Sequence, residues 1–332
     1  MARPPHVSRR PAMYPVPEFP PRKARLFART PPAVFPVLLG LLGLGLALRK
    51  GLADLALPGG LADLVLGAVG ALWLFAALAY GLKLARRPGV LAEDMRALPG
   101  RGGVAALSQG GMALAGSLAP MAPGLGKGLL VAALLVHAVQ AVVLVGVLRR
   151  LPDAARKVNP TLHLTFVGPL VGAVSAQVLG WSDLAVALFW AMLPVAVLIW
   201  GLNAALFARE VPPAPLRPLL AIHLAPASLL ATVAAQTGRE ELAVGLALSG
   251  GAYLLLLLVS ARWLLGAGFS PMWGSLTFPL AAFAGALFML GWVWSGVMVL
   301  VLTLGLVPWI AARVLKMWAT GSLAQRTNAA EA

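Results

Sequence analysis

Few side chains in this chain could do chemistry. There are four histidines and no cysteine, which excludes disulfides, thiolate metal sites and a cysteine nucleophile. No two histidines have metal-ligand spacing with a carboxylate. The sequence also lacks a nucleophile elbow, an aspartate-rich motif and a phosphate loop. It therefore offers no basis for an enzyme, a metal site or a cofactor.

His163 and His223 each lie within an apolar stretch, where an imidazole could have a functional role. Each could contact an anion or carry a proton. The alternative is that each histidine only forms a hydrogen bond to a backbone carbonyl near the membrane interface. His137 is expected to be a packing residue, and the hydroxyl of Thr277 is a further candidate for an anion contact.

Phe278 stands alone on a face of small residues. On a helix, counting by threes and fours places Gly274, Phe278 and Gly285 on one side, opposite a bulky apolar side. Pro279 follows directly and is expected to kink the helix. A ring held in this way would suit a plug in a narrow pore. The alternative is that Phe278 is an ordinary packing aromatic.

The composition is that of an integral membrane protein. The chain of 332 residues is 60% hydrophobic and 11% charged, with a mean hydropathy of +0.88. Ten apolar stretches of spanning length can be drawn: 33–48, 64–82, 104–121, 129–148, 162–179, 184–207, 219–235, 242–259, 272–290 and 293–312. They predict an all-α fold, with residues 1–30 as a disordered basic tail, 31–318 as the membrane domain and 319–332 as a short, disordered tail.

The basic residues indicate the orientation. Of the 26 lysines and arginines, only Arg49, Lys50, Lys127 and Arg239 fall in the first, third, fifth, seventh and ninth loops. The remainder lie in the two tails and the other loops. This positive-inside pattern predicts cytoplasmic termini, and it explains the net charge of +15 without a nucleic-acid partner.

Prolines recur along the odd-numbered stretches, at Pro36, Pro120, Pro169, Pro226 and Pro279. From Pro120 onward their spacing is about one helical hairpin, which suggests an array. We therefore expect five hairpins, with five inner, kinked helices rich in small residues such as Gly40 and five outer helices facing lipid. The odd stretches contain no Asp, Glu, Lys or Arg. An inner lining of this kind has no fixed negative charge that could hold a cation. It therefore favours a passive path for anions.

Three stretches resemble the tellurite-resistance/dicarboxylate transporter family, which includes the plant slow anion channel. Residues 159–173 (NPTLHLTFVGPLVGA) and 269–279 (FSPMWGSLTFP) look like two motifs of that family, and residues 31–41 are similar to its first helix. The resemblance covers about residues 30–318. One departure is Pro169, where the plant-like motif has asparagine, and this puts the anion preference in doubt.

The resemblance implies ten transmembrane helices with quasi-five-fold symmetry around a central pore that Phe278 occludes. It also implies a homotrimer in a bacterial inner membrane. Three functions remain open. The first is a gated channel for small anions such as chloride or nitrate. The second is a proton-coupled carrier of tellurite or a C4-dicarboxylate, for which His163 or His223 would be the coupling group. The third is a membrane scaffold that transports nothing.

Overall fold

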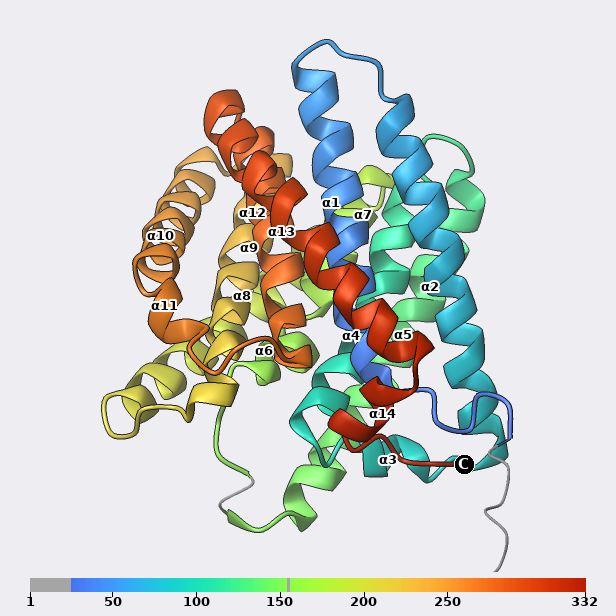
Figure 1. Ribbon diagram of the computed structural model, residues 1–332. Helices are drawn as coiled ribbons and strands as arrows, with labels where there is room; N and C mark the ends of the chain where they lie inside the picture. The colour runs from blue at the N-terminus through green and yellow to red at the C-terminus, as the bar shows by residue number, and fades with distance from the viewer. Residues whose placement is uncertain (1–24, 154–155) are drawn as a thin grey trace, which may run out of the picture.

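The computed structural model describes residues 25–153 and 156–332, and this part of the chain is helical and contains no strand (Figure 1). The expected basic tail lies mostly in residues 1–24, outside the described residues. The long helices are α1 (Phe35–Asp54), α2 (Gly60–Arg86), α4 (Leu98–Ser117), α5 (Pro123–Arg150), α8 (Ser182–Phe207), α10 (Glu240–Val259) and α13 (Val293–Ala319). The shorter elements are η1 (Pro32–Val34), α3 (Val90–Asp94), α6 (Thr161–Phe166), α7 (Pro169–Val178), η3 (Ala214–His223), α9 (Leu224–Gln236), α11 (Ala261–Leu264), η4 (Pro271–Leu276), α12 (Thr277–Met289) and α14 (Ser322–Arg326).

Helices lie at all ten of the expected positions, and eight of them are long and apolar enough to cross a membrane. The two others are α4 and the pair α6–α7. Helix α4 has 20 residues but is polar in places, and α6–α7 is interrupted at Val167 and Gly168. A membrane helix can be broken where neighbouring protein satisfies its backbone. The count of ten spans stays a prediction.

Five helices form the centre of the bundle. Helices α1, α4, α7, α9 and α12 contact one another in that order, and α12 returns to α1, so that they close a ring. The spans that contain α1, α9 and α12 are 67–89% buried, whereas those of α2, α5, α8, α10 and α13 are 22–33% buried. The expected division into inner odd helices and outer even helices is therefore confirmed.

Each outer helix covers a junction between two inner helices. Helix α2 packs on α1 and α4, α5 on α4 and α7, α8 on α7 and α9, α10 on α9 and α12, and α13 on α12 and α1. In each case, one of the two inner helices directly precedes the outer helix in the chain. The other is the next inner helix around the ring. The same contact pattern thus repeats five times, which is the arrangement expected of five hairpins.

Four of the five recurrent prolines lie at the start of an inner helix and not in its middle. Pro36, Pro169, Pro226 and Pro279 lie in the first turns of α1, α7, α9 and α12. A helix does not use its first backbone N–H groups, so proline is tolerated there. At Pro169 the inner helix is interrupted directly before the proline, between α6 and α7, as expected of a kinked inner helix. Pro120 is exposed and follows the end of α4, so the expected kink at Pro120 is wrong. The irregularity of the inner ring comes from the break before α7 and from the 3-10 turns η3 and η4, which precede α9 and α12.

The last residues are ordered, contrary to the disorder expected for 319–332. Helix α14 follows α13, and the chain then runs back to the N-terminal segment, where the amide N–H of Ala332 donates to the carbonyl O of Ala28 at 3.1 Å. The C-terminus and residue 25 therefore lie at the same end of the bundle, opposite the loop between α1 and α2 (Figure 1).

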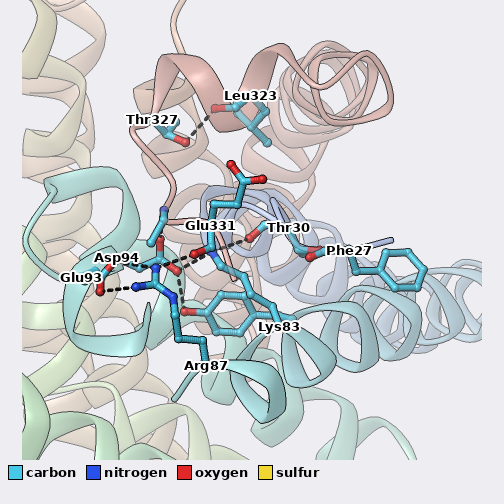
Figure 2. A network of polar contacts seen from close by, with 11 residues as sticks. Phe27, Thr30, Lys83, Arg87, Glu93, Asp94, Leu323, Thr327 and Glu331 are labelled. Atoms are coloured by element: carbon cyan, nitrogen blue, oxygen red, sulfur yellow. Dashed lines mark hydrogen bonds and ion pairs between the residues drawn. The ribbon is translucent and has the colours of Figure 1, made fainter. Parts of the chain in front are cut away.

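A buried carboxylate holds this end together (Figure 2). Asp94, which is fully buried, accepts hydrogen bonds from Lys83 Nζ at 2.8 Å, Tyr80 Oη at 2.9 Å and the backbone N of Ala330 at 2.7 Å. Lys83 Nζ also donates to the carbonyl O of Thr30 at 3.1 Å. Near Asp94, the guanidinium of Arg87 forms an ion pair with Glu93 and donates a hydrogen bond to the carbonyl O of Glu331. Asp94 thereby joins α2, α3 and the C-terminal residues.

Replacement of Asp94 by leucine is expected to lower the free energy of unfolding by about 3–5 kcal/mol, because it leaves the buried ammonium of Lys83 without its counter-ion. The double variant Lys83→Met/Asp94→Leu should lose less, since both charges are removed together. Thermal unfolding of the purified protein in detergent measures both. Equal losses would show that the bonds of Asp94 to Tyr80 and Ala330 matter more than the ion pair.

Candidate functional site

A small cavity lies within the ring of inner helices, and we call it the gate chamber. Its volume is about 20 Å³, which is room for one small species such as a water molecule. Helices α4, α6, α7, α9 and α12 and the turn η3 all contribute to its wall. The lining residues are Gln109, His163, Leu164, Val167, Gly168, Val171, Ile222, Ala225, Pro226, Leu229 and Phe278. None of them is acidic or carries a permanent charge.

Phe278 forms one wall of the gate chamber from the first turn of α12, and only 7% of it is exposed. Its ring also lies close to Gly43 of α1. A Cβ atom built on Gly43 would be 3.0 Å from Cδ2 and 3.3 Å from Cε2 of the ring. Phe278 therefore contacts α1 and also lines the chamber. Gly43 leaves room for the ring because it has no side chain.

Thr277 and Gly40 bring α1 and α12 together beside Phe278. The hydroxyl of Thr277 is buried and lies 3.0 Å from the carbonyl O of Pro36 and 2.7 Å from that of Gly274. A Cβ atom on Gly40 would be 2.2 Å from Thr277 Oγ1. The hydroxyl of Thr277 therefore donates to backbone carbonyls. Thr277 does not line the gate chamber.

The other residues predicted to line a pore are in varied surroundings. Pro226 lines the gate chamber, whereas Pro36, Gly40, Pro120, Pro169, Gly274 and Gly285 do not. A Cβ atom on Gly274 would lie 3.4 Å from Pro36 and Val37, which makes Gly274 a contact with α1. A Cβ atom on Gly285 would have no neighbouring atom within 4 Å. For these residues a pore-lining role stays a prediction.

His163 and His223 form a buried pair between two cavities. Nε2 of His163 lies 3.0 Å from Nδ1 of His223, and the rings stand nearly perpendicular. His163 lines the gate chamber, and its Nδ1 has no hydrogen-bond partner among the described residues. His223 lines a second, larger cavity at the side of the bundle. The two histidines, 60 residues apart in the sequence, thus connect the two spaces.

The chain matches the SLAC1 family, described as a voltage-dependent anion channel, over residues 29–318. It belongs to this family. The match covers the whole ring and the outer helices. Among curated proteins, no sequence matches the chain significantly. The chain is therefore an integral membrane protein of the anion channel or transporter type, in agreement with the resemblance seen in its motifs.

The broken inner helix of this SLAC1-family protein is supported by side chains whose roles the sequence did not reveal. Pro169 has no N–H, so the carbonyl O of Thr165 lacks the partner that a continuous helix would provide. Nε2 of His137 lies 2.8 Å from that oxygen and satisfies it. Gln109 Nε2 donates to the preceding carbonyl O, that of Leu164, at 2.5 Å. His137, which was expected to be a packing residue, is thus a hydrogen-bond partner of the broken helix, and this role follows from Pro169.

A buried cation on an inner helix was also missed. Helix α4 begins at Leu98, six residues before the expected span, and therefore includes Arg101, which is 1% exposed. The expectation that the inner helices carry no charged residue is wrong at this position, and also in α1, whose last turns contain Arg49, Lys50 and Asp54. The sequence signal was the Leu-Pro pair at 98–99, because proline is favoured in the first turn of a helix. Within the described part of the chain, no group of three His, Cys, Asp or Glu residues could hold a metal ion.

Proposed function

We propose that this protein is a gated channel for small inorganic anions such as chloride and nitrate, with a path through the centre of the inner ring that Phe278 closes. The observation that carries the proposal is the position of Phe278, which contacts Gly43 of α1 and lines the gate chamber together with the other inner elements. A hydrophobic constriction of this kind stops ions because it excludes water.

The surroundings of the chamber favour anions over cations. No carboxylate is among its lining residues, so nothing there would hold a cation. Helices α9 and α12 begin beside the chamber, at Leu224 and Thr277, but the turns η3 and η4 run directly into them. The backbone amides there already donate to carbonyls of those turns, so the preference for anions rests on the absence of a carboxylate.

A second candidate is a proton-coupled carrier of tellurite or a C4-dicarboxylate. One observation favours it: His163 lines the chamber, and its buried Nδ1, which has no partner among the described residues, could bind a proton. The other ring nitrogen of His163, Nε2, lies 3.0 Å from Nδ1 of His223, so a proton taken up at Nδ1 could be passed on as the proton between the two rings moves to His223. A scaffold without transport is the third candidate, and no contact in the structure favours it.

Ion flux from proteoliposomes separates these functions. A channel would dissipate chloride and nitrate gradients in either direction and independently of a pH gradient, and more rapidly in Phe278→Ala than in the wild type. A carrier would saturate with substrate and respond to pH, and this response would disappear in His163→Gln. If neither variant nor wild type moves any of these anions, the transport proposal is refuted.

The remaining parts of the proposal concern assembly and orientation. We infer a homotrimer with one path per protomer, on the family resemblance. We infer a bacterial inner membrane from the same resemblance. We infer cytoplasmic termini because the end of the bundle that carries the C-terminus also holds most of the basic loops (Figure 1). Protease accessibility of the C-terminus in sealed, inside-out vesicles tests the orientation.

A further inference from the structure

The larger cavity is a groove on the outer wall of the bundle, between α8 and α10. Its volume is about 1160 Å³. Trp200 and Phe207 of α8 form one side, Leu246 and Leu257 of α10 form the other, and His223 lies in the floor. These two outer helices are among the least buried of the bundle, at 22% and 28% of their spans. In a membrane the groove would face lipid.

The depth of the groove corresponds to one leaflet. Eleven residues separate Leu246 from Leu257, which is about 16 Å along a helix. The hydrocarbon core of a bilayer is about 30 Å thick, so this length is about half of it. The lining along this length is mainly apolar, with Ser249 and Tyr253 as the polar residues of α10. These dimensions suit an acyl chain that enters from the side of the basic loops.

The end of the groove at those loops is positively charged. Arg96, Arg101 and Lys157 line it, and Glu210 is the one acidic residue among the lining residues. Glu210 pairs with Lys157 at 2.6 Å, which leaves the two arginines in excess. Lysines and arginines between membrane helices on the cytoplasmic side are typical of sites for anionic head groups.

Arg101 in particular lacks a counter-ion. Its Nε donates to the carbonyl O of Met95 at 3.3 Å, and its Nη1 has no partner among the described residues. Lys83, which is the other fully buried cation among the described residues, is paired with Asp94. A buried charge without a partner is costly. A guanidinium binds a phosphate with two parallel hydrogen bonds, so a phosphate oxygen would supply what Arg101 lacks.

We propose that the groove between α8 and α10 binds an anionic phospholipid, with its phosphate at Arg96 and Arg101 and an acyl chain between the two helices. A second copy of this protein fits less well. Copies in one membrane share an orientation, so a neighbour would bring its own basic loops to the level of the arginines. The bound chain would rest on His223, which joins His163 at the gate chamber. The site itself does not depend on the proposed pore.

Lipid binding to the purified, delipidated full-length protein tests this site. Native mass spectrometry would count the molecules of phosphatidylglycerol and of phosphatidylcholine bound at increasing concentrations. We expect Arg96→Gln/Arg101→Gln to weaken phosphatidylglycerol binding at least about tenfold, because a charge-assisted bidentate contact is lost. The same variant should leave phosphatidylcholine binding unchanged. The matched control is Arg149→Gln/Arg150→Gln, which removes two exposed arginines at the same end but outside the groove. This control should bind both lipids as the wild type does.

A second variant fills the groove without changing its charge. Ser249 is exposed on α10, so Ser249→Trp should fold and should displace the acyl chain. We expect it to reduce phosphatidylglycerol binding even with both arginines present. The proposal is overturned if both groove variants bind phosphatidylglycerol like the control. It is also overturned if Ser249→Trp changes the oligomeric mass and leaves lipid binding intact, because the groove would then be a contact between copies. Neither readout requires conductance, so failure of the channel proposal would be recognised separately.

Discussion

Replacement of Phe278 by alanine is expected to raise the chloride conductance of the protein in planar bilayers by at least about tenfold, since an apolar constriction would be widened and wetted. The physical reason is local. Phe278 contacts Gly43 and lines the gate chamber, and nothing else in α12 does both. Truncation at Cβ would join the chamber to the space that the ring fills. Nitrate should show the same increase, because the lining has no group that selects between the two anions by charge.

Phe283→Ala is the matched control for this experiment. Phe283 lies on the same helix and is 3% exposed, but its ring packs against Gly250 of α10 and does not line the chamber. Its removal should lower stability and leave the conductance near the wild-type value. Equal conductance of Phe278→Ala and the wild type would show that Phe278 is a packing residue. An increase in both variants would indicate general loosening of α12.

The hairpin array could be predicted from the sequence because two independent patterns agree. Long apolar stretches alternate with loops, and the small and polar residues fall on the odd stretches, which become the inner ring. Helices facing lipid need only be apolar, whereas helices packed on both sides need small residues for close approach. The difference between Leu-rich α10 and Gly-rich α4 therefore indicates their places in the bundle.

The interruptions could not be placed in the same way. A proline in an apolar stretch predicts either a kink or a helix start, and the sequence does not decide between them. At Pro169 the decision depends on His137 and Gln109, which accommodate the break from other helices. The ordered C-terminus likewise depends on Asp94, 236 residues before Ala330. Contacts over such separations carry no periodic signal.

The candidate site was partly visible in the sequence. Phe278 was identified because it interrupts a face of small residues, and the structure places it in the chamber wall. Its partner Gly43 was one of several spaced glycines in α1, and no local feature distinguished it from Gly40. The pairing of His163 with His223 joins α6 to η3 and follows only from the packing of the ring.

Gly40→Ala and Gly285→Ala are expected to have opposite effects on stability, although both add one methyl group to an inner helix. A Cβ atom on Gly40 would lie 2.2 Å from Oγ1 and 2.4 Å from Cβ of Thr277, and the backbone N of Phe278 is 3.1 Å away. Helices α1 and α12 would have to separate. Overpacking of this kind costs about 1–3 kcal/mol or more. On Gly285 the methyl group meets nothing within 4 Å, so the higher helix propensity of alanine should stabilise α12 by up to about 1 kcal/mol.

Thermal unfolding in detergent, followed by tryptophan fluorescence, measures this pair directly. Gly40→Ala should unfold at a clearly lower temperature than the wild type, and Gly285→Ala at the same or a higher one. The double variant Gly40→Ala/Thr277→Gly should recover part of the loss, because it removes the two side-chain atoms that the new methyl group would meet. If Gly40→Ala is as stable as the wild type, α1 and α12 are less closely packed than the structure shows. The position of Phe278 beside Gly43 would then need to be determined again, since the same two helices fix it.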